Sequence, residues 1–173
     1  MKSIQLAFTL GLVTVLSACA SKPASKPKSR TAPTQSSSVK PMRITHIDQQ
    51  FGAQELMFNT MSLIGTPYKY GGSNTSTGFD CSGMIQFVYK NALDVNLPRT
   101  ARDLAAASRS IDPSKLKAGD LVFYNTGSPY SHVGLYIGNG EFIHAPSSRG
   151  TIRTEKMSSP YFAKRFTKAG TFF

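Results

Sequence analysis

Hydrophobic positions in the first half of the domain recur at spacings typical of helices. A run from about residue 50 ends at Gly65 and Pro67, and residues 81–91 and 99–108 predict two further helices. A stretch rich in Gly, Ser and Thr over residues 71–78 predicts a loop. The apolar positions expected to form the buried face of the first helix are Phe51, Leu56, Met57, Met61, Leu63 and Ile64; those of the second are Ile85, Val88 and Tyr89.

The second half of the chain changes to short apolar runs separated by turn residues. Residues 121–124, 133–137 and 141–145 predict strands, and residues 151–154 and 168–173 predict two more. Gly138-Asn139-Gly140 is a tight hairpin connection, because all three residues tolerate positive φ. Helices followed by a meander of strands predict an α+β fold, with N-terminal helices packed on an antiparallel sheet of five or six strands.

The N-terminal residues have the pattern of a targeting signal rather than that of a folded domain. Residues 1–18 combine Lys2 with an apolar stretch over residues 4–16 and small residues before Cys19, as a secretory signal peptide does. The apolar run is short for a transmembrane helix. We therefore expect the signal peptide to end at residue 18.

A polar segment separates the signal from the domain. Residues 20–43 are rich in Ser, Lys, Pro and Thr and have no apolar periodicity, which predicts a disordered tether within residues 19–49 and a catalytic domain over residues 50–173. Of the net charge of +11, six units fall in residues 20–43, which hold no acid. This charge suits an anionic membrane or wall surface, although ordinary solvated lysines explain it as well, and it is no nucleic-acid signature.

Cys81 is the only thiol of the predicted domain. It stands at the expected start of a helix, where the helix dipole favours a thiolate and lowers the thiol pKa. Gly83 leaves room for a substrate to approach the backbone. A cysteine in this position is otherwise a small buried hydrophobe, so a nucleophile needs a base nearby.

Two histidines can supply that base. Pairing the predicted hairpin around Asn139 sets residue 134 opposite residue 144, so His132 and His144 are neighbours on adjacent strands and share a face. The hypothesis is a triad with His132 as base and His144 as orienter; the alternative is two unrelated sheet histidines. His46 lies in the tether. The spacing of Cys and His forms no zinc pattern, so we expect no metal and no cofactor.

Five ordered segments, from about residue 52 to the C-terminus, resemble the NlpC/P60 family of cell-wall cysteine peptidases. Within it, the chain resembles the lipoprotein murein endopeptidases of Gram-negative bacteria, which share a lipobox and a short basic tether. The segments are Pro67–Gly72, Phe79–Gly83, Ala118–Phe123, Ser131–Gly138 and Phe142–Ala145.

The resemblance implies a papain-like fold and roles for individual residues. It implies Cys81 as nucleophile, His132 as general base and acid, and His144 as the third polar residue. Tyr68 matches a tyrosine placed near the nucleophile, where it assists the oxyanion hole, or it is an ordinary half-buried tyrosine. Asp80 and Ser82 flank the nucleophile, and they either contact the substrate amine or cap a helix. Arg99 and Arg102 follow Leu97-Pro98, and they either bind substrate carboxylates or form a solvated helix face.

Leu16-Ser17-Ala18-Cys19 resembles a lipobox, in which Cys19 is diacylated and becomes the new N-terminus. Ala20 after it is similar to lipoproteins exported to the outer membrane. The resemblance thus implies a lipid-anchored chain facing the periplasm; the alternative is a plain signal peptide.

The expected function is hydrolysis of stem-peptide or cross-link bonds of peptidoglycan by a Cys-His-His thiol mechanism. We expect a monomer whose partners are peptidoglycan stem peptides and, through Cys19, the membrane, and that binds no nucleic acid. Two alternatives are an amidase of another substrate on the same fold and a non-catalytic wall-binding lipoprotein.

Overall fold

The computed structural model describes residues 41–147 and 150–173. The expected signal peptide, Cys19 and most of the expected tether lie outside the described residues. None of the helices in the described part combines the length and apolar character that crossing a bilayer requires.

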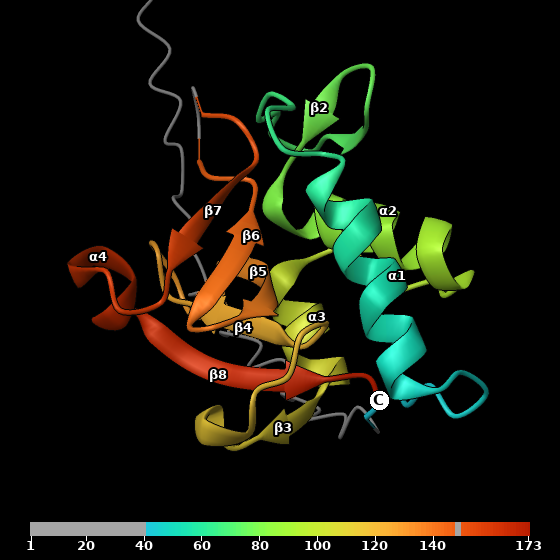
Figure 1. Ribbon diagram of the computed structural model, residues 1–173. Helices are drawn as coiled ribbons and strands as arrows, with labels where there is room; N and C mark the ends of the chain where they lie inside the picture. The colour runs from blue at the N-terminus through green and yellow to red at the C-terminus, as the bar shows by residue number, and fades with distance from the viewer. Residues whose placement is uncertain (1–40, 148–149) are drawn as a thin grey trace, which may run out of the picture. The chain divides into compact units, whose positions relative to one another are not determined.

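The described residues form an α+β domain, as predicted. Figure 1 labels its elements, which are α1 (Gln49–Met61), β1 (Ser73–Asn74), β2 (Gly78–Phe79), α2 (Cys81–Leu93), α3 (Ala101–Ala107), β3 (Arg109–Ile111), the 3-10 helix η1 (Pro113–Lys115), β4 (Leu121–Tyr124), β5 (His132–Gly138), β6 (Glu141–His144), β7 (Arg153–Lys156), α4 (Pro160–Ala163) and β8 (Phe166–Thr171).

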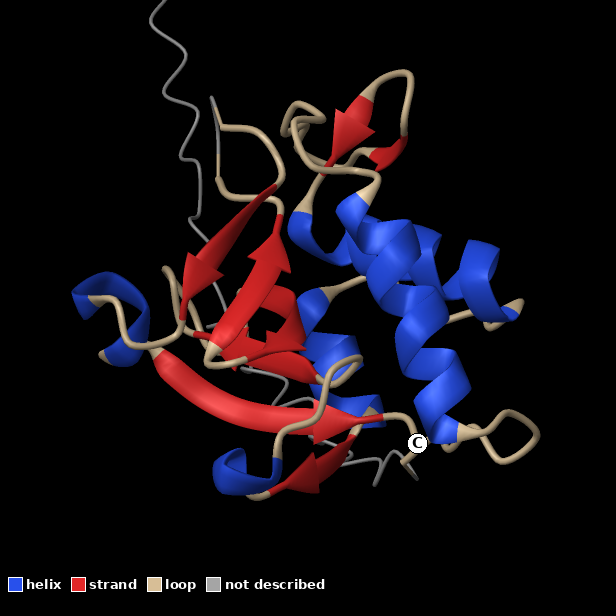
Figure 2. Ribbon diagram, in the orientation of Figure 1, coloured by secondary structure: helices blue, strands red, loops and turns tan. Residues whose placement is uncertain are grey.

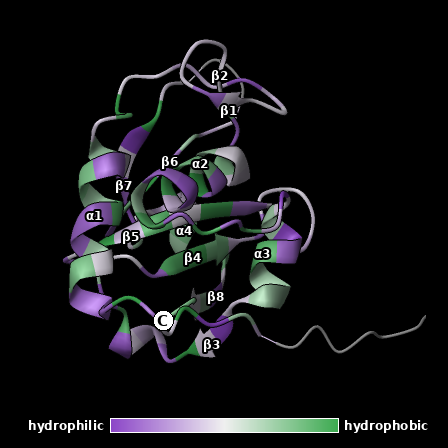
Figure 3. Cartoon of the chain, turned by 90° about the vertical axis from the view of Figure 1, so that its right-hand side faces the viewer, coloured by the Kyte–Doolittle hydropathy of each residue, from purple (hydrophilic) through white to green (hydrophobic). Residues whose placement is uncertain are grey.

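The main sheet has six antiparallel strands in the order β3-β8-β4-β5-β6-β7. Helices α1, α2 and α3 lie on one side of it and the short α4 on the other (Figure 2). Strand β4 is buried on both faces: Leu121 and Phe123 join the core under the long helices, and Val122 and Tyr124 join a smaller core with Phe162 of α4. The hydropathy colouring shows β4 as a green, apolar strand in the centre of the domain (Figure 3).

The hairpin between β5 and β6 has the predicted register. Leu135 pairs with Ile143 and Tyr136 with Phe142, and Gly138, Asn139 and Gly140 all have positive φ, at 102°, 52° and 73°. The pairing of Gly138 with Glu141 shifts the register next to the turn. The hairpin therefore brings the strand segments carrying the two histidines side by side.

Helix α2 begins at Cys81 and presents Ile85, Val88 and Tyr89 to the core, as predicted. Its N-cap is Asp80, whose side chain accepts a hydrogen bond from the Gly83 N–H. An aspartate at this position satisfies an N–H that the first helical turn leaves unpaired. The cap thus fixes where the helix starts and places Cys81 in its first turn.

The predicted buried face of α1 was wrong for several residues. Phe51, Met61 and Ile64 are about half exposed, at 57%, 52% and 47%, whereas the helix buries Gly52, Leu56 and Thr60. Positions four residues apart share a helix face, but positions five apart, such as 51 and 56, do not. Gly52 packs against the ring of Phe173, and a Cβ at this position would lie only 2.7 Å from that ring. A larger residue therefore does not fit there.

Other differences concern boundaries and small elements. The expected third helix begins at Ala101 with Thr100 as its N-cap, so Arg99 precedes it. The expected loop 71–78 contains the two short strands β1 and β2, and the last two strands are shifted by about two residues to β7 and β8. Strand β3, η1 and α4 were not predicted; each is four residues or fewer, too short to show a period.

The folded part starts before residue 50. The Met42 N–H donates to Ala107 O and the Ile44 N–H to Phe172 O, at 2.8 and 2.6 Å, and Ile44 is buried. Residues 42–44, which we had placed in the tether, therefore pack on the domain.

Candidate active site

Cys81 lies in the first turn of α2, beside the start of β5. Its Sγ is 4.0 Å from the carbonyl oxygen of Ser131, the residue that precedes His132. The thiol is half-buried and lines a pocket. The helix start and the strand start therefore place the thiol next to the backbone that carries His132.

His132 and His144 contact each other directly, as the hairpin register predicted. The Nε2 atom of His132 lies 2.7 Å from Nδ1 of His144, and both side chains are buried. Because Nε2 of His132 is engaged with His144, Nδ1 is the nitrogen left to take a proton from a thiol. This tautomer makes His132 the donor to His144, which then carries its own proton on Nε2.

An aromatic cage surrounds the histidine pair. Phe162 of α4 stacks against His132, with ring centroids 6.2 Å apart, and meets His144 edge-on at 5.2 Å. Tyr124 stands opposite His132 in the β4–β5 ladder, and Phe142 lies 5.1 Å from the His144 ring. Burial lowers the pKa of His132 to about 4 and, together with the charges of His132 and Arg153, that of His144 to about 2. Both imidazoles are thus neutral bases at neutral pH.

The thiol itself does not have the lowered pKa that the sequence suggested. Burial, and next the negative charge of Asp80, raise the pKa of Cys81, while backbone N–H groups of Val133, Ser82 and Cys81 lower it by less. The helix start was expected to dominate, but a carboxylate immediately before the cysteine opposes the helix dipole. Burial therefore favours the neutral forms of both the Cys81 thiol and the His132 imidazole.

Both carboxylate oxygens of Asp80 accept hydrogen bonds from other residues of the chain. One carboxylate oxygen accepts from the Gly83 N–H, the Ser82 hydroxyl and Arg99 Nη1, and the other accepts from the Gly71 N–H and Arg99 Nη2, at 2.6–3.1 Å. Side-chain contact with Arg99 and the N–H of Gly83 outweigh burial and lower the Asp80 pKa. Asp80 was expected either to contact the substrate amine or to cap a helix. In this structure it caps α2 and forms an ion pair with Arg99.

Gly83 serves the fold rather than the approach of a substrate. A Cβ at this position would lie 2.1 Å from the carbonyl oxygen of Gly72, in the loop before β1. The space beside Gly83, which we predicted to be open to a substrate, is therefore filled by the backbone of Gly72. This close approach holds the loop that carries Tyr68 and Tyr70 against the start of α2.

A family model described as the NlpC/P60 family matches residues 65–171. The chain belongs to the NlpC/P60 family. The match spans the cysteine helix, both histidine strands and the rest of the main sheet. The resemblance drawn from the five sequence segments is thus confirmed.

Relatives within the NlpC/P60 family differ in how much of their length the chain matches. It is 39% identical to "Murein DD-endopeptidase MepH" of Escherichia coli strain K12 over 117 residues, which is 65% of this chain but only 43% of MepH. It is 32% identical to "Murein DD-endopeptidase MepS/Murein LD-carboxypeptidase" of the same strain over 169 residues, 92% of this chain and 87% of that protein.

Solved NlpC/P60 structures have the same fold. A Staphylococcus aureus protein described as similar to lipoprotein, NLP/P60 family, superposes with a TM-score of 0.64 at 35% identity, covering 73% of this chain and 42% of that one. The NlpC/p60 domain of the peptidoglycan hydrolase SagA gives a TM-score of 0.61 at 30% identity, covering 69% and 97%. The α+β NlpC/P60 fold is therefore confirmed.

The remaining residues that the family resemblance singled out gather around Cys81. A pocket of about 670 Å³ is lined by residues that include Tyr68, Asp80, Cys81, Ser82, Arg99 and Arg102. Burial, followed by the charges of Cys81 and Asp80, raises the pKa of Tyr68, so its hydroxyl keeps its proton and remains a donor. Arg99 is committed to Asp80, which leaves Arg102 as the exposed cation of this pocket.

Sequence reasoning missed the loop that closes the other side of this pocket. Residues 128–131 line it, and Tyr130 holds the left-handed backbone conformation, with φ of 53°. A non-glycine residue with positive φ has no reliable signature in a single sequence. Among the described residues, no group of three or more His, Cys, Asp or Glu side chains is placed to bind a metal.

Proposed function

We propose that this chain is a peptidoglycan endopeptidase that uses Cys81 as its nucleophile. The observation that carries the proposal is the direct contact of buried, neutral His132 and His144, together with the position of the thiol next to the backbone of Ser131, which precedes His132. The names of MepH and MepS, murein DD-endopeptidases, support murein as the substrate. A wall-binding module has no need of a thiol, a base and an orienter in one place.

The reaction begins with proton transfer within the site. His132 Nδ1 takes the thiol proton as Sγ of Cys81 attacks the peptide carbonyl carbon, and His144 holds the imidazolium that forms. The Cys81 N–H and the Tyr68 hydroxyl donate to the oxyanion. The C–N bond then breaks, His132 returns the proton to the leaving amine, and water hydrolyses the thioester to restore the thiol.

Starting from a neutral pair has a consequence for the mechanism. Burial raises the pKa of the thiol and lowers that of His132, so it favours the neutral forms of both groups in the free site. This environment suits general-base assistance by His132 as Cys81 attacks the substrate.

We also propose that Cys19 is lipidated and anchors the chain to the outer membrane, with the domain in the periplasm. The lipobox-like Leu16-Ser17-Ala18-Cys19 and Ala20 support this placement. The polar, basic residues up to 40 then span the distance from the membrane to the wall. Membrane fractionation and intact-protein mass spectrometry test the anchor. Cys19→Ser is expected to lose both membrane association and the mass of the acyl chains, whereas the control Ser21→Ala keeps both. A wild-type protein without acyl mass contradicts the proposal.

Mass spectrometry of muropeptides released from purified sacculi tests the hydrolase. Wild type is expected to release new fragments whose masses identify the bond, while Cys81→Ala and His132→Ala release none. His46→Ala is the matched control, because His46 is exposed and remote in sequence from the site. Fragments that persist with Cys81→Ala contradict the mechanism. Absence of fragments with wild type contradicts murein as substrate and favours another amide or isopeptide.

A further inference from the structure

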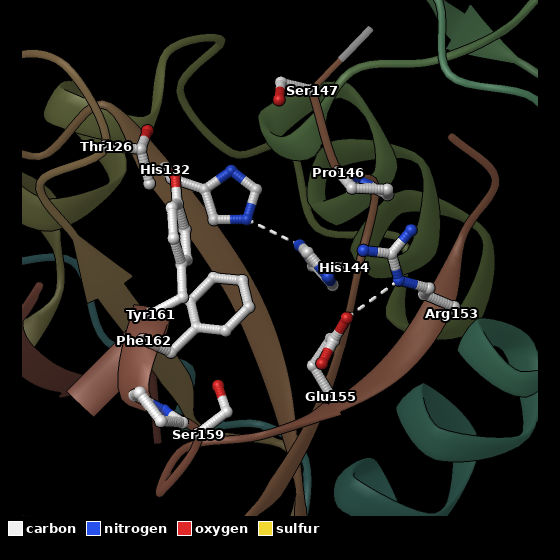
Figure 4. A pocket seen from close by; sticks show the side chains of 11 residues that line it. Thr126, His132, His144, Pro146, Ser147, Arg153, Glu155, Ser159, Tyr161 and Phe162 are labelled. Atoms are coloured by element: carbon white, nitrogen blue, oxygen red, sulfur yellow. Dashed lines mark hydrogen bonds and ion pairs between the residues drawn. The ribbon is translucent and has the colours of Figure 1, made fainter. Parts of the chain in front are cut away.

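The two halves of the proposed catalytic machinery open onto different pockets. Cys81 lines the pocket with Tyr68 and Arg99, whereas His132 and His144 line a second pocket of about 630 Å³, here called the histidine-side pocket. The histidine-side pocket is further lined by Arg153 and Glu155 of β7 and by Tyr161 and Phe162 of α4. Figure 4 shows Arg153 and Glu155 across from Tyr161 and Phe162, with His144 between them and His132 above Phe162.

Proton transfer decides which part of a substrate belongs in each pocket. The acyl part becomes bonded to Sγ of Cys81 and so stays on the cysteine side. The leaving amine receives its proton from His132 Nδ1 and so lies between the thiol and His132, a residue that lines the histidine-side pocket. The amino acid that carries this amine is therefore expected to occupy the histidine-side pocket.

Arg153 is placed to recognise a group on that amino acid. It is the direct cross-strand partner of His144, so the pair shares one face of the sheet, and His132 lies on the adjacent strand. The Nε of Arg153 donates to Glu155 at 2.9 Å, and the side chain is 49% exposed. Within the described part of the chain, its Nη1 and Nη2 have no hydrogen-bond acceptor, and these paired donors match a carboxylate.

His144, which lines the same pocket, holds a second donor. Its side chain is 1% exposed, and its Nε2 is buried with no hydrogen-bond partner among residues 41–147 and 150–173. With Nδ1 accepting from His132, this Nε2 carries a proton. A buried donor without an acceptor is costly, so the wall of the pocket is short of hydrogen-bond acceptors beside Arg153.

We propose that the histidine-side pocket binds the leaving amino acid and that Arg153 binds a free carboxylate on it. Glu155 is a positioning residue, since it holds Nε and turns the two Nη groups toward the ligand. This inference rests on the proposed hydrolase function and deepens it. It selects bonds whose leaving amino acid ends in a free carboxylate, as at a peptide C-terminus or at a cross-link to the side-chain amine of a diamino acid.

Two synthetic peptides test the proposal with the full chain. They share the acyl part and differ only in whether the leaving amino acid carries a free carboxylate or a carboxamide. Wild type is expected to cleave the carboxylate peptide with a kcat/KM about 10- to 100-fold higher, from the loss of charge-assisted hydrogen bonds in the amide. Arg153→Gln is expected to lose this preference, because its kcat/KM falls about 10- to 100-fold further on the carboxylate peptide than on the carboxamide peptide.

The controls separate this inference from its alternatives. Lys156→Gln removes the same charge from the same strand at an exposed position and is expected to keep the wild-type preference. Equal losses on both peptides in Arg153→Gln make Arg153 structural and overturn the inference. Equal cleavage of both peptides by wild type overturns it while leaving the hydrolase function intact. Cleavage of neither peptide, together with intact sacculi, overturns the proposed function as well.

Discussion

In the proposed mechanism, the pKa of His132 sets the pH range in which this residue can act as the base. Since burial lowers that pKa to about 4, His132 remains unprotonated at pH 5.5, where an ordinary histidine with a pKa of about 6.5 is mostly charged. We expect kcat/KM, corrected for the folded fraction, to be constant from pH 7.5 to 5.5. Initial rates on a soluble cross-linked peptide, with circular dichroism at each pH, provide the measurement.

The aromatic cage supplies the control for this expectation. Phe162→Ala removes the ring that packs on both histidines, hydrates them, and is expected to raise the His132 pKa toward 6.5. The variant should then lose activity as the pH falls below about 6.5. A tenfold loss in the wild type between pH 6.5 and 5.5 is the result that contradicts neutral, caged histidines.

The histidine pair was predictable from sequence because a two-stranded hairpin is a local structure. The glycines at 138 and 140 fixed the turn, and the turn fixed the register that joins His132 to His144. The cage was not predictable in the same way. Phe162 comes from a single helical turn 30 residues beyond His132, and only the complete fold brings it there.

At the scale of elements, two aspartates cap two helices and differ in what else they bind. Asp48 is exposed, and within the described residues its side chain accepts from the Gln50 and Phe51 N–H groups at the start of α1, whereas the side chain of Asp80 also pairs with Arg99. We expect Asp48→Ala to cost about 1 kcal/mol of unfolding free energy, as a lost cap does. Asp80→Ala is expected to cost about 2 to 4 kcal/mol, because it also leaves the half-buried Arg99 unpaired.

Urea unfolding of both variants measures the difference. Asp80→Asn separates cap from charge, because asparagine caps a helix as well as aspartate does but does not neutralise Arg99. Its stability is expected to fall between the wild type and Asp80→Ala. Equal costs for Asp48→Ala and Asp80→Ala contradict the role assigned to the ion pair.

Helix α1 shows where element-level reasoning failed. Counting apolar residues found the helix and its buried Leu56, but not the rest of the buried face, which consists of Gly52 and Thr60. A glycine and a threonine carry little hydrophobic signal, and Gly52 is buried because the C-terminal Phe173 packs on it. Contacts between the two ends of the domain are not visible in a window of one helix.

For the whole molecule, the order of the strands was the least predictable feature. The last strand, β8, lies between β3 and β4, so the sheet is completed by pairings between residues 42 to 62 positions apart in the chain. No turn fixes such a pairing; it follows from burying β4 on both faces. The sequence therefore predicted the fold class and the hairpin that carries the two histidines, but not the topology around them.

The buried histidines also couple the stability of the whole domain to pH. The pKa values of His132 and His144 are lowered to about 4 and about 2 in the folded state, against about 6.5 in an unfolded chain. Between pH 6.5 and 4 the unfolded chain binds protons that the folded domain excludes. Their contribution to stability is therefore complete above pH 6.5 and is lost as the pH falls through this window, by about 1.4 kcal/mol per pH unit for each histidine.

Urea unfolding at pH 7.5, 6.5, 5.5 and 4.5 tests this coupling. The unfolding free energy of the wild type is expected to change little between pH 7.5 and 6.5 and to fall steeply below. His144→Asn removes one titrating group and should reduce the slope by about half, whereas His46→Asn, at an exposed position, should retain the full slope. A slope in His144→Asn as steep as that of the wild type would mean that other groups drive the acid transition.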